Sequence, residues 1–142
     1  MSGSGSILDQ LFPFFATTAE ITVRVQPHYA ADHSQPEAGA WMWRYHVRIE
    51  NHGDQLVRLL DRHWIIRDAA GRREDVEGPG VVGEQPLIPP GGAHDYVSAC
   101  PLGTPSGTME GSYGMERADG TRFRAKIPLF ALVSPDSRRT AN

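Results

Sequence analysis

Apolar and polar residues alternate with a period of two along most of this chain, which is the pattern of half-buried β-strands. The clearest case is residues 41–50, in which one phase is large and apolar: Trp41, Trp43, Tyr45, Val47 and Ile49. A slip of one residue would expose all five side chains, so the register of this strand is strongly specified. We therefore expect both tryptophans in the core, and the charged residues of the other phase on a solvated sheet face.

The same alternation predicts further strands between glycine and proline residues: 21–26, 56–66, 72–77, 93–100, 109–116 and 122–127. Val57 and Leu59 lie in one phase of their segment, whereas Trp64 and Ile66 lie in the other. Such a phase change predicts a bend or bulge near residues 60–61. The dipeptide at residues 119–120, Asp-Gly, predicts a two-residue hairpin loop.

No segment of ten or more residues has an apolar period of 3.6, so the fold class is all-β. Short strands separated by turns predict an antiparallel β-sandwich of about seven or eight strands. The chain has one cysteine, which favours a fibronectin type III-like (immunoglobulin-like) sandwich over a disulfide-bonded immunoglobulin domain.

The 142 residues predict one domain with a loosely attached segment at each end. Residues 1–17 are expected to be flexible or loosely packed, with a short helix or strap in the apolar part, residues 7–16. That part is too short to span a membrane, so no membrane insertion is expected. The sandwich is expected over residues 18–133, followed by a disordered polar tail at residues 134–142.

The net charge of −3 and the dispersed lysines and arginines give no basic surface for nucleic acid. The single cysteine, Cys100, excludes a disulfide framework and fits a reducing compartment, so a cytoplasmic location is expected. Cys100 itself is interpreted as a small strand residue without a reactive thiolate.

Residues 78–86 contain Gly78, Gly80 and Gly83, which have the spacing of a dinucleotide-binding G-x-G-x-x-G motif. Prolines at positions 86, 89 and 90 forbid the helix that such a site needs, so a Rossmann site is rejected. The favoured interpretation is a strand connection in which glycines supply positive φ angles. A looser nest of backbone N–H groups that binds phosphate stays open, and the loop, with Glu84 and Gln85 at its tip, is the best candidate binding surface.

The sequence offers no catalytic constellation, so no catalytic residue and no cofactor are assigned. His63, next to Arg62, is the best-placed histidine, and these two are the candidate residues flanking the loop. The favoured interpretation of His63 is a half-buried strand residue hydrogen-bonded to the backbone. His28, Asp32 and His33 lie close in sequence, but two histidines on a loop are too few ligands, so no metal site is expected.

Five segments together resemble the ApaG family: residues 62–64, 78–86, 96–98, 104–113 and 127–130. The resemblance covers roughly residues 18–133 and implies a fibronectin type III-like sandwich. It further implies an association with cobalt tolerance and magnesium efflux in bacteria, and a role as an interaction module in eukaryotic relatives. No catalytic residues are established for the family, so the resemblance carries none to this chain.

The function expected from the sequence is a non-catalytic module that docks a protein partner. The alternative is a binder of phosphate-rich small molecules, such as pyrophosphate or a nucleotide, through residues 78–83. A basic residue inside this loop would favour the alternative, and the loop has none; the nearest upstream are Arg72 and Arg73.

Overall fold

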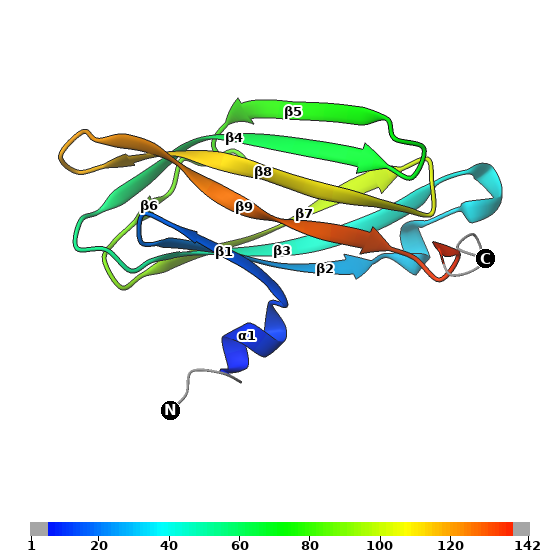
Figure 1. The fold of residues 1–142 in the computed structure, drawn as a ribbon, viewed down its shortest axis with the longest axis horizontal. Helices are drawn as coiled ribbons and strands as arrows, with labels where there is room; N and C mark the ends of the chain where they lie inside the picture. The colour runs from blue at the N-terminus through cyan, green and yellow to red at the C-terminus, as the bar shows by residue number, and fades with distance from the viewer. Residues whose placement is uncertain (1–5, 138–142) are drawn as a thin grey trace.

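The computed structural model describes residues 6–137, whose strands form two packed antiparallel sheets (Figure 1). The first sheet has the strand order β1-β2-β3-β7, and the second has the order β5-β4-β8-β9, with β6 paired to β4. This arrangement confirms the predicted antiparallel β-sandwich. The described residues contain nine strands, since the short strands β1 and β6 add to those predicted.

The strands are β1 Phe14–Thr18, β2 Ile21–Tyr29, β3 Trp41–Asn51, β4 Val57–Asp68, β5 Arg73–Pro79, β6 Leu87–Ile88, β7 Ala93–Leu102, β8 Ser106–Arg117 and β9 Arg122–Val133. The helical elements are short: α1 Ile7–Leu11 and two 3-10 turns at Ala31–His33 and Pro36–Ala38. No helix within residues 6–137 is long and apolar enough to cross a membrane.

The core fills the space between the sheets with the apolar phase of each strand. Trp43, Tyr45, Val47 and Ile49 of β3 are each at most 5% exposed, and Trp41 packs partly buried at the edge of the core. The register predicted for this strand is therefore confirmed, as is the core position of the aromatic residues.

A β-bulge interrupts β4 where the apolar phase changes. The pairing of β4 with β8 shifts between Leu59 and Asp61. Leu59 before the bulge and Trp64 after it are both buried in the core. The extra residue rotates the rest of the strand, so the even-numbered side chains that follow point inward. The predicted bulge is confirmed, and it determines that Arg62 points inward.

The hairpin between β8 and β9 differs from the predicted two-residue loop. Arg117 N–H donates to Thr121 O at 2.8 Å, and Gly120 N–H donates to Arg117 O at 2.9 Å. Gly120 has φ +87° and follows the turn instead of sitting within a two-residue loop. The loop is therefore the three-residue kind, in which a left-handed glycine follows a turn; the Asp119 carboxylate supports it by accepting the Thr121 N–H.

The sandwich begins earlier than the expected boundary at residue 18. Strand β1 pairs with β2 from Phe14 onward, and the Phe14 ring packs 5.9 Å from that of Phe130 in the core. Before it, α1 lies outside the sandwich (Figure 1), and Phe12 is buried with its ring 4.9 Å from that of His46. The predicted short helix is confirmed, but residues 14–17 belong to the sheet because their apolar phase reaches the core.

The expected disordered tail is wrong for residues 134–137. Ser134 is 3% exposed and its hydroxyl donates to Pro105 O, while Trp41 Nε1 donates to the Asp136 carboxylate at 3.0 Å. These contacts tie the segment to the ends of β3 and β8. Residues 138–142 and residues 1–5, where the remaining expectations of flexibility fall, lie outside the described range.

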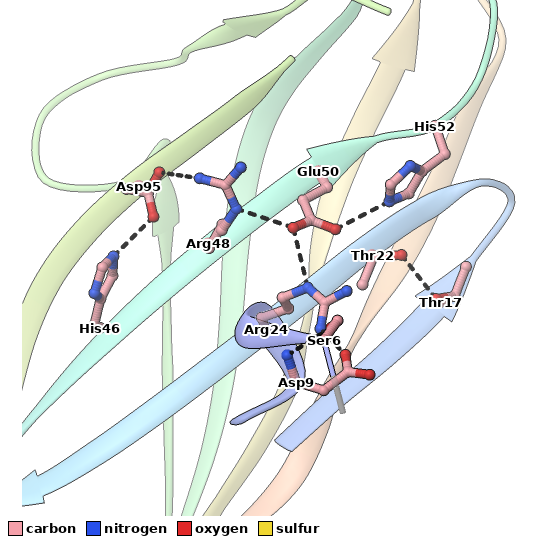
Figure 2. Close-up of polar contacts among 10 residues, drawn as sticks. All are labelled: Ser6, Asp9, Thr17, Thr22, Arg24, His46, Arg48, Glu50, His52 and Asp95. Carbon is pink, nitrogen blue, oxygen red and sulfur yellow. Dashed lines mark hydrogen bonds and ion pairs between the residues drawn. The ribbon is translucent and has the colours of Figure 1, made fainter. Parts of the chain in front are cut away.

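A network of ion pairs covers the outer face of the first sheet (Figure 2). Glu50 is 4% exposed as a residue, and its carboxylate accepts from Arg24 Nε at 3.0 Å and Arg48 Nε at 2.9 Å, with His52 Nε2 at 3.0 Å. Arg24 also donates to Asp9 of α1 at 2.7 Å. This face was expected to be solvated, but the network and the N-terminal helix partly bury it.

Glu50→Gln is expected to lower the free energy of unfolding at neutral pH by roughly 1.5–3 kcal/mol, because charged hydrogen bonds are lost. Burial acts to raise the pKa of Glu50, but hydrogen bonds from Arg48, His52 and Arg24 outweigh it and hold this pKa below its usual value. A carboxylate whose pKa is lower in the folded state stabilises the protein at pH values above its unfolded-state pKa. This stabilisation is lost as the pH falls through the folded-state pKa.

The difference in unfolding free energy between wild type and Glu50→Gln should therefore shrink below about pH 4. Urea unfolding at several pH values measures it. Glu77→Gln, which removes an exposed carboxylate without an ion pair among residues 6–137, is the control. A difference that stays constant with pH would contradict the role given to Glu50.

Candidate functional site

A cleft of about 420 Å³ opens along one side of the sandwich, between the edge strands β5 and β7. On the opposite side, β9 lies against β1 and β2 and closes the sandwich. The cleft is lined by side chains of both sheets and by the turn that follows β5. Val82 on this turn is 65% exposed and lies at the rim, whereas Val97 of β7, which is 55% exposed, belongs to the phase that faces the outer side of the first sheet.

Aromatic side chains form the inner wall of the cleft. Trp64 of β4 lies with its ring 5.2 Å from that of Tyr45 and 6.3 Å from that of Tyr113. The hydroxyl of Tyr96 on β7 is hydrogen-bonded to that of Tyr113 on β8. Burial raises the pKa of Tyr96 and Tyr113, so both phenols stay protonated at neutral pH.

Cys100 lines the cleft as a buried residue of β7. Burial raises the pKa of its thiol to about 12, and the negative charge of Glu74 adds to the rise. A thiol in this state is a poor nucleophile, since the reactive form is the thiolate. The interpretation of Cys100 as a small structural strand residue is confirmed.

The glycine-rich stretch forms a tight turn at one end of the cleft. Val81 and Glu84 exchange backbone hydrogen bonds of 2.8 and 3.0 Å across the two residues between them. Those residues, Val82 and Gly83, have φ angles of +48° and +79°, as in a type I′ turn. Gly80 N–H donates to Leu60 O at 2.9 Å. Three backbone N–H groups of this stretch are therefore already engaged with carbonyls.

Gly80 is the position in this turn where only glycine fits. Its φ is +61°, and a Cβ built on it would lie 2.0 Å from the backbone oxygen of Glu84. Gly83 has a positive φ as well, but a Cβ there would meet no atom within 4 Å. The spacing that resembles a phosphate-binding motif thus coincides with the backbone requirements of a turn.

The candidate flanking residues Arg62 and His63 lie on opposite faces of β4. Arg62 lines the cleft, and its Nη1 donates to Pro79 O at 3.0 Å and Gly80 O at 3.1 Å, which fastens the turn to β4. His63 points outward, with its Nε2 2.7 Å from the Asp75 carboxylate. The expected backbone partner of His63 is therefore wrong, because the neighbouring strand β5 presents a carboxylate at that position.

The remaining candidate residues of the loop serve the turn. Gln85 Nε2 donates to Leu60 O at 2.8 Å, and the backbone of Glu84 pairs with Val81. Gly78 lies beside Arg62, whose Nη1 would be 3.0 Å from a Cβ at that position. Of the residues singled out in the sequence, Arg62 is the one that faces the cleft with a charged side chain.

The histidines near the first 3-10 turn do not assemble a metal site. His33 Nδ1 lies 3.1 Å from the Asp32 carboxylate and 3.0 Å from Arg44 Nη2, so a cation already occupies its surroundings. Within residues 6–137 no group of three or more His, Cys, Asp or Glu side chains is placed to hold a metal ion.

The sequence did not identify the cleft itself. The alternation along β7 places Tyr96, Ser98 and Cys100 on one face, and that along β5 places Glu74 and Val76 on one face. Both alternations are visible in the sequence, but only the strand order shows that the inward faces of β5 and β7 border the same cleft.

Known proteins are similar to this chain in sequence. The family model for the ApaG domain matches residues 31–117. The chain belongs to the ApaG family. Protein ApaG of Rhodospirillum centenum is 54% identical over 125 residues, covering 88% of this chain and 96% of that protein. Protein ApaG of Paramagnetospirillum magneticum is 51% identical over 126 residues, covering 89% and 97%.

A solved structure supports the fold as well. The ApaA protein from Bordetella pertussis superposes with a TM-score of 0.79 at 40% identity, covering 85% of this chain and 95% of that one. The range matched by the ApaG domain contains every residue that lines the cleft, whereas α1, β1, β2 and β9 lie outside it. The cleft therefore belongs to the part of the chain by which the family is defined.

Proposed function

We propose that this ApaG-family chain is a non-catalytic module that docks a protein partner in the cleft between β5 and β7. The observation that carries the proposal is an open cleft with exposed Val82 at its rim, bordered by two edge strands. Exposed apolar side chains around a preformed groove, together with unpaired strand edges, are features that protein partners use.

The chemistry of the lining supports binding over catalysis. The Cys100 thiol and the Tyr96 phenol are protonated, and His63 lies on the other face of β4. A nucleophile paired with a base, which covalent catalysis needs, is not assembled among the described residues of the cleft. The association with cobalt tolerance and magnesium efflux would then act through the bound partner, in the reducing compartment expected of the chain.

Phosphate binding near residues 78–83 is the second candidate function, and one observation favours it. Arg62 lies beside the turn, and a guanidinium has five N–H donors, of which the Nη1 contacts use only a part. The N–H groups of Gly80, Val81 and Glu84 already donate to carbonyls, so a backbone nest would have fewer donors to offer.

Cross-linking in cells tests the docking site. A photoreactive benzoylphenylalanine at position 97 is expected to capture a protein partner, whereas the same group at position 129 is expected to capture none. Val97 and Leu129 are each 55% exposed, so the two positions are matched in accessibility. Val97 lies on the edge strand that borders the cleft, whereas Leu129 lies on β9, away from the cleft lining. Capture from position 129 but not from position 97 would overturn the proposal.

A further inference from the structure

The two edge strands that border the cleft differ in how they are protected. β5 carries four charged residues in succession or alternation: Arg73, Glu74, Asp75 and Glu77. β7 pairs with β3 on one side, and its segment 96–100 contains neither a charged residue nor proline. Charges and prolines are the usual means of keeping a foreign strand from an exposed edge. The edge of β7 is therefore the one open to strand addition.

Two opposite charges stand at opposite ends of the cleft. Glu74 pairs with Ile66, and Gly78 pairs with Arg62, so the two charged side chains lie at two levels of the cleft, which are the positions of residues 74 and 78 along β5. These two levels are four residues apart. Glu74 forms no ion pair among residues 6–137, whereas its neighbour Asp75 is held by Arg73.

The β7 wall has the same two levels. Glu74 lines a hollow together with Pro101, the neighbour of Cys100, so this carboxylate lies at the Cys100 end, and its negative charge adds to the burial that raises the pKa of Cys100. Arg62 pairs with Tyr113 of β8, whose hydroxyl is hydrogen-bonded to that of Tyr96, so this guanidinium lies at the Tyr96 end. Four residues of strand span about 13 Å, and alternate side chains face the same way.

Resting on the proposed function, we propose that the cleft binds an extended segment of the protein partner, which adds to β7 as an antiparallel strand. A basic side chain of the segment faces Glu74, an apolar side chain two residues later packs on Val76, and an acidic side chain after two more faces Arg62. β7 runs from the Arg62 end to the Glu74 end, so an antiparallel strand meets Glu74 first. Antiparallel pairs are also the more frequent and the more stable arrangement.

A designed peptide tests the order of charges with the full chain. The probe is a capped peptide of threonine, lysine, threonine, valine, threonine, glutamate and threonine, titrated by calorimetry. The peptide with lysine and glutamate exchanged is expected to bind about tenfold more weakly, because both charge pairs become repulsive. Equal affinity of the two peptides, or no binding of either at millimolar concentration, would overturn the proposal.

A charge reversal in the cleft tests the role of Glu74. Glu74→Lys is expected to weaken binding of the first peptide about tenfold, and replacing the lysine of the peptide with glutamate should restore it. Glu77→Lys makes the same change of net charge on the outer face of β5 and should alter the affinity less than about twofold. Equal losses in both variants would mean that net charge, and not this site, attracts the peptide.

Amide hydrogen exchange tests strand addition directly. Binding of the first peptide is expected to slow exchange at alternate residues of segment 96–100, since every second amide of an edge strand faces the added strand. Unchanged exchange there, with chemical shifts moving only on the outer face of the first sheet, would overturn the proposal. Cross-linking from position 97 without peptide binding would reject strand addition alone, whereas loss of both would reject the docking site itself.

Discussion

Trp43→Ala is expected to lower the free energy of unfolding by about 3–5 kcal/mol, as for a large aromatic residue truncated in a core. Trp43 is 1% exposed, and its ring lies 5.5 Å from that of Tyr29. Its Nε1 donates to Val133 O at 3.0 Å, so the truncation also removes this hydrogen bond. Urea unfolding followed by circular dichroism measures the loss.

Trp41→Ala is the matched control, because Trp41 lies on the same strand and in the same phase but is only partly buried. Its loss should be clearly smaller than that of Trp43→Ala, since less surface is removed from the core. A loss below about 1 kcal/mol for Trp43→Ala would contradict its place in the core and reopen a role in recognition.

Gly80→Ala is expected to destabilise the fold by about 2–4 kcal/mol, which combines left-handed backbone strain with a steric clash. The Cβ would lie 2.0 Å from the Glu84 backbone oxygen, so the turn must open to accept it. Gly83→Ala is the control: its φ is equally positive but its Cβ meets no atom, so about 1 kcal/mol is expected. Thermal and urea unfolding compare the variants, and equal losses would show that the close approach at Gly80 is not limiting.

Unfolding of the wild type with and without pyrophosphate tests whether residues 78–83 are only a structural turn or also a ligand site. Phosphate binding would stabilise the wild type by about 2.7 kcal/mol at a hundredfold excess over Kd, and salt would weaken the effect. We expect no such gain at millimolar pyrophosphate, because the backbone donors of Gly80, Val81 and Glu84 are engaged. A saturable, salt-sensitive gain would favour the second candidate function.

Local pattern was enough to predict most strands and their inward faces. The alternation around Trp43 fixed the register of β3, because any slip would expose large apolar groups. The change of phase between Leu59 and Trp64 located the bulge of β4 for the same reason. The type of the turn at Gly120 was predicted wrongly, since Asp-Gly suits both a two-residue loop and a turn followed by a left-handed glycine.

Glycine and proline spacing was informative about what residues 78–86 could not be. The prolines excluded a helix after Gly83, and with it a dinucleotide site. The hydrogen-bond partners of the loop could not be predicted from the sequence, because Leu60 and Arg62 contact it from β4, some twenty residues earlier in the chain. The same holds for β1, which pairs with β2 and whose Phe14 packs on Phe130, a residue far away in the chain.

The sequence by itself determined the class of fold, because each strand has its own alternation of apolar and polar residues, and this local pattern is enough to predict a half-buried strand. The tertiary structure decided the cleft. Glu74 of β5 and Cys100 of β7 belong to different sheets, and they border one opening because β7 crosses to the first sheet while β5 ends the second. Strand order follows from long-range pairing across the whole core, which no single segment encodes.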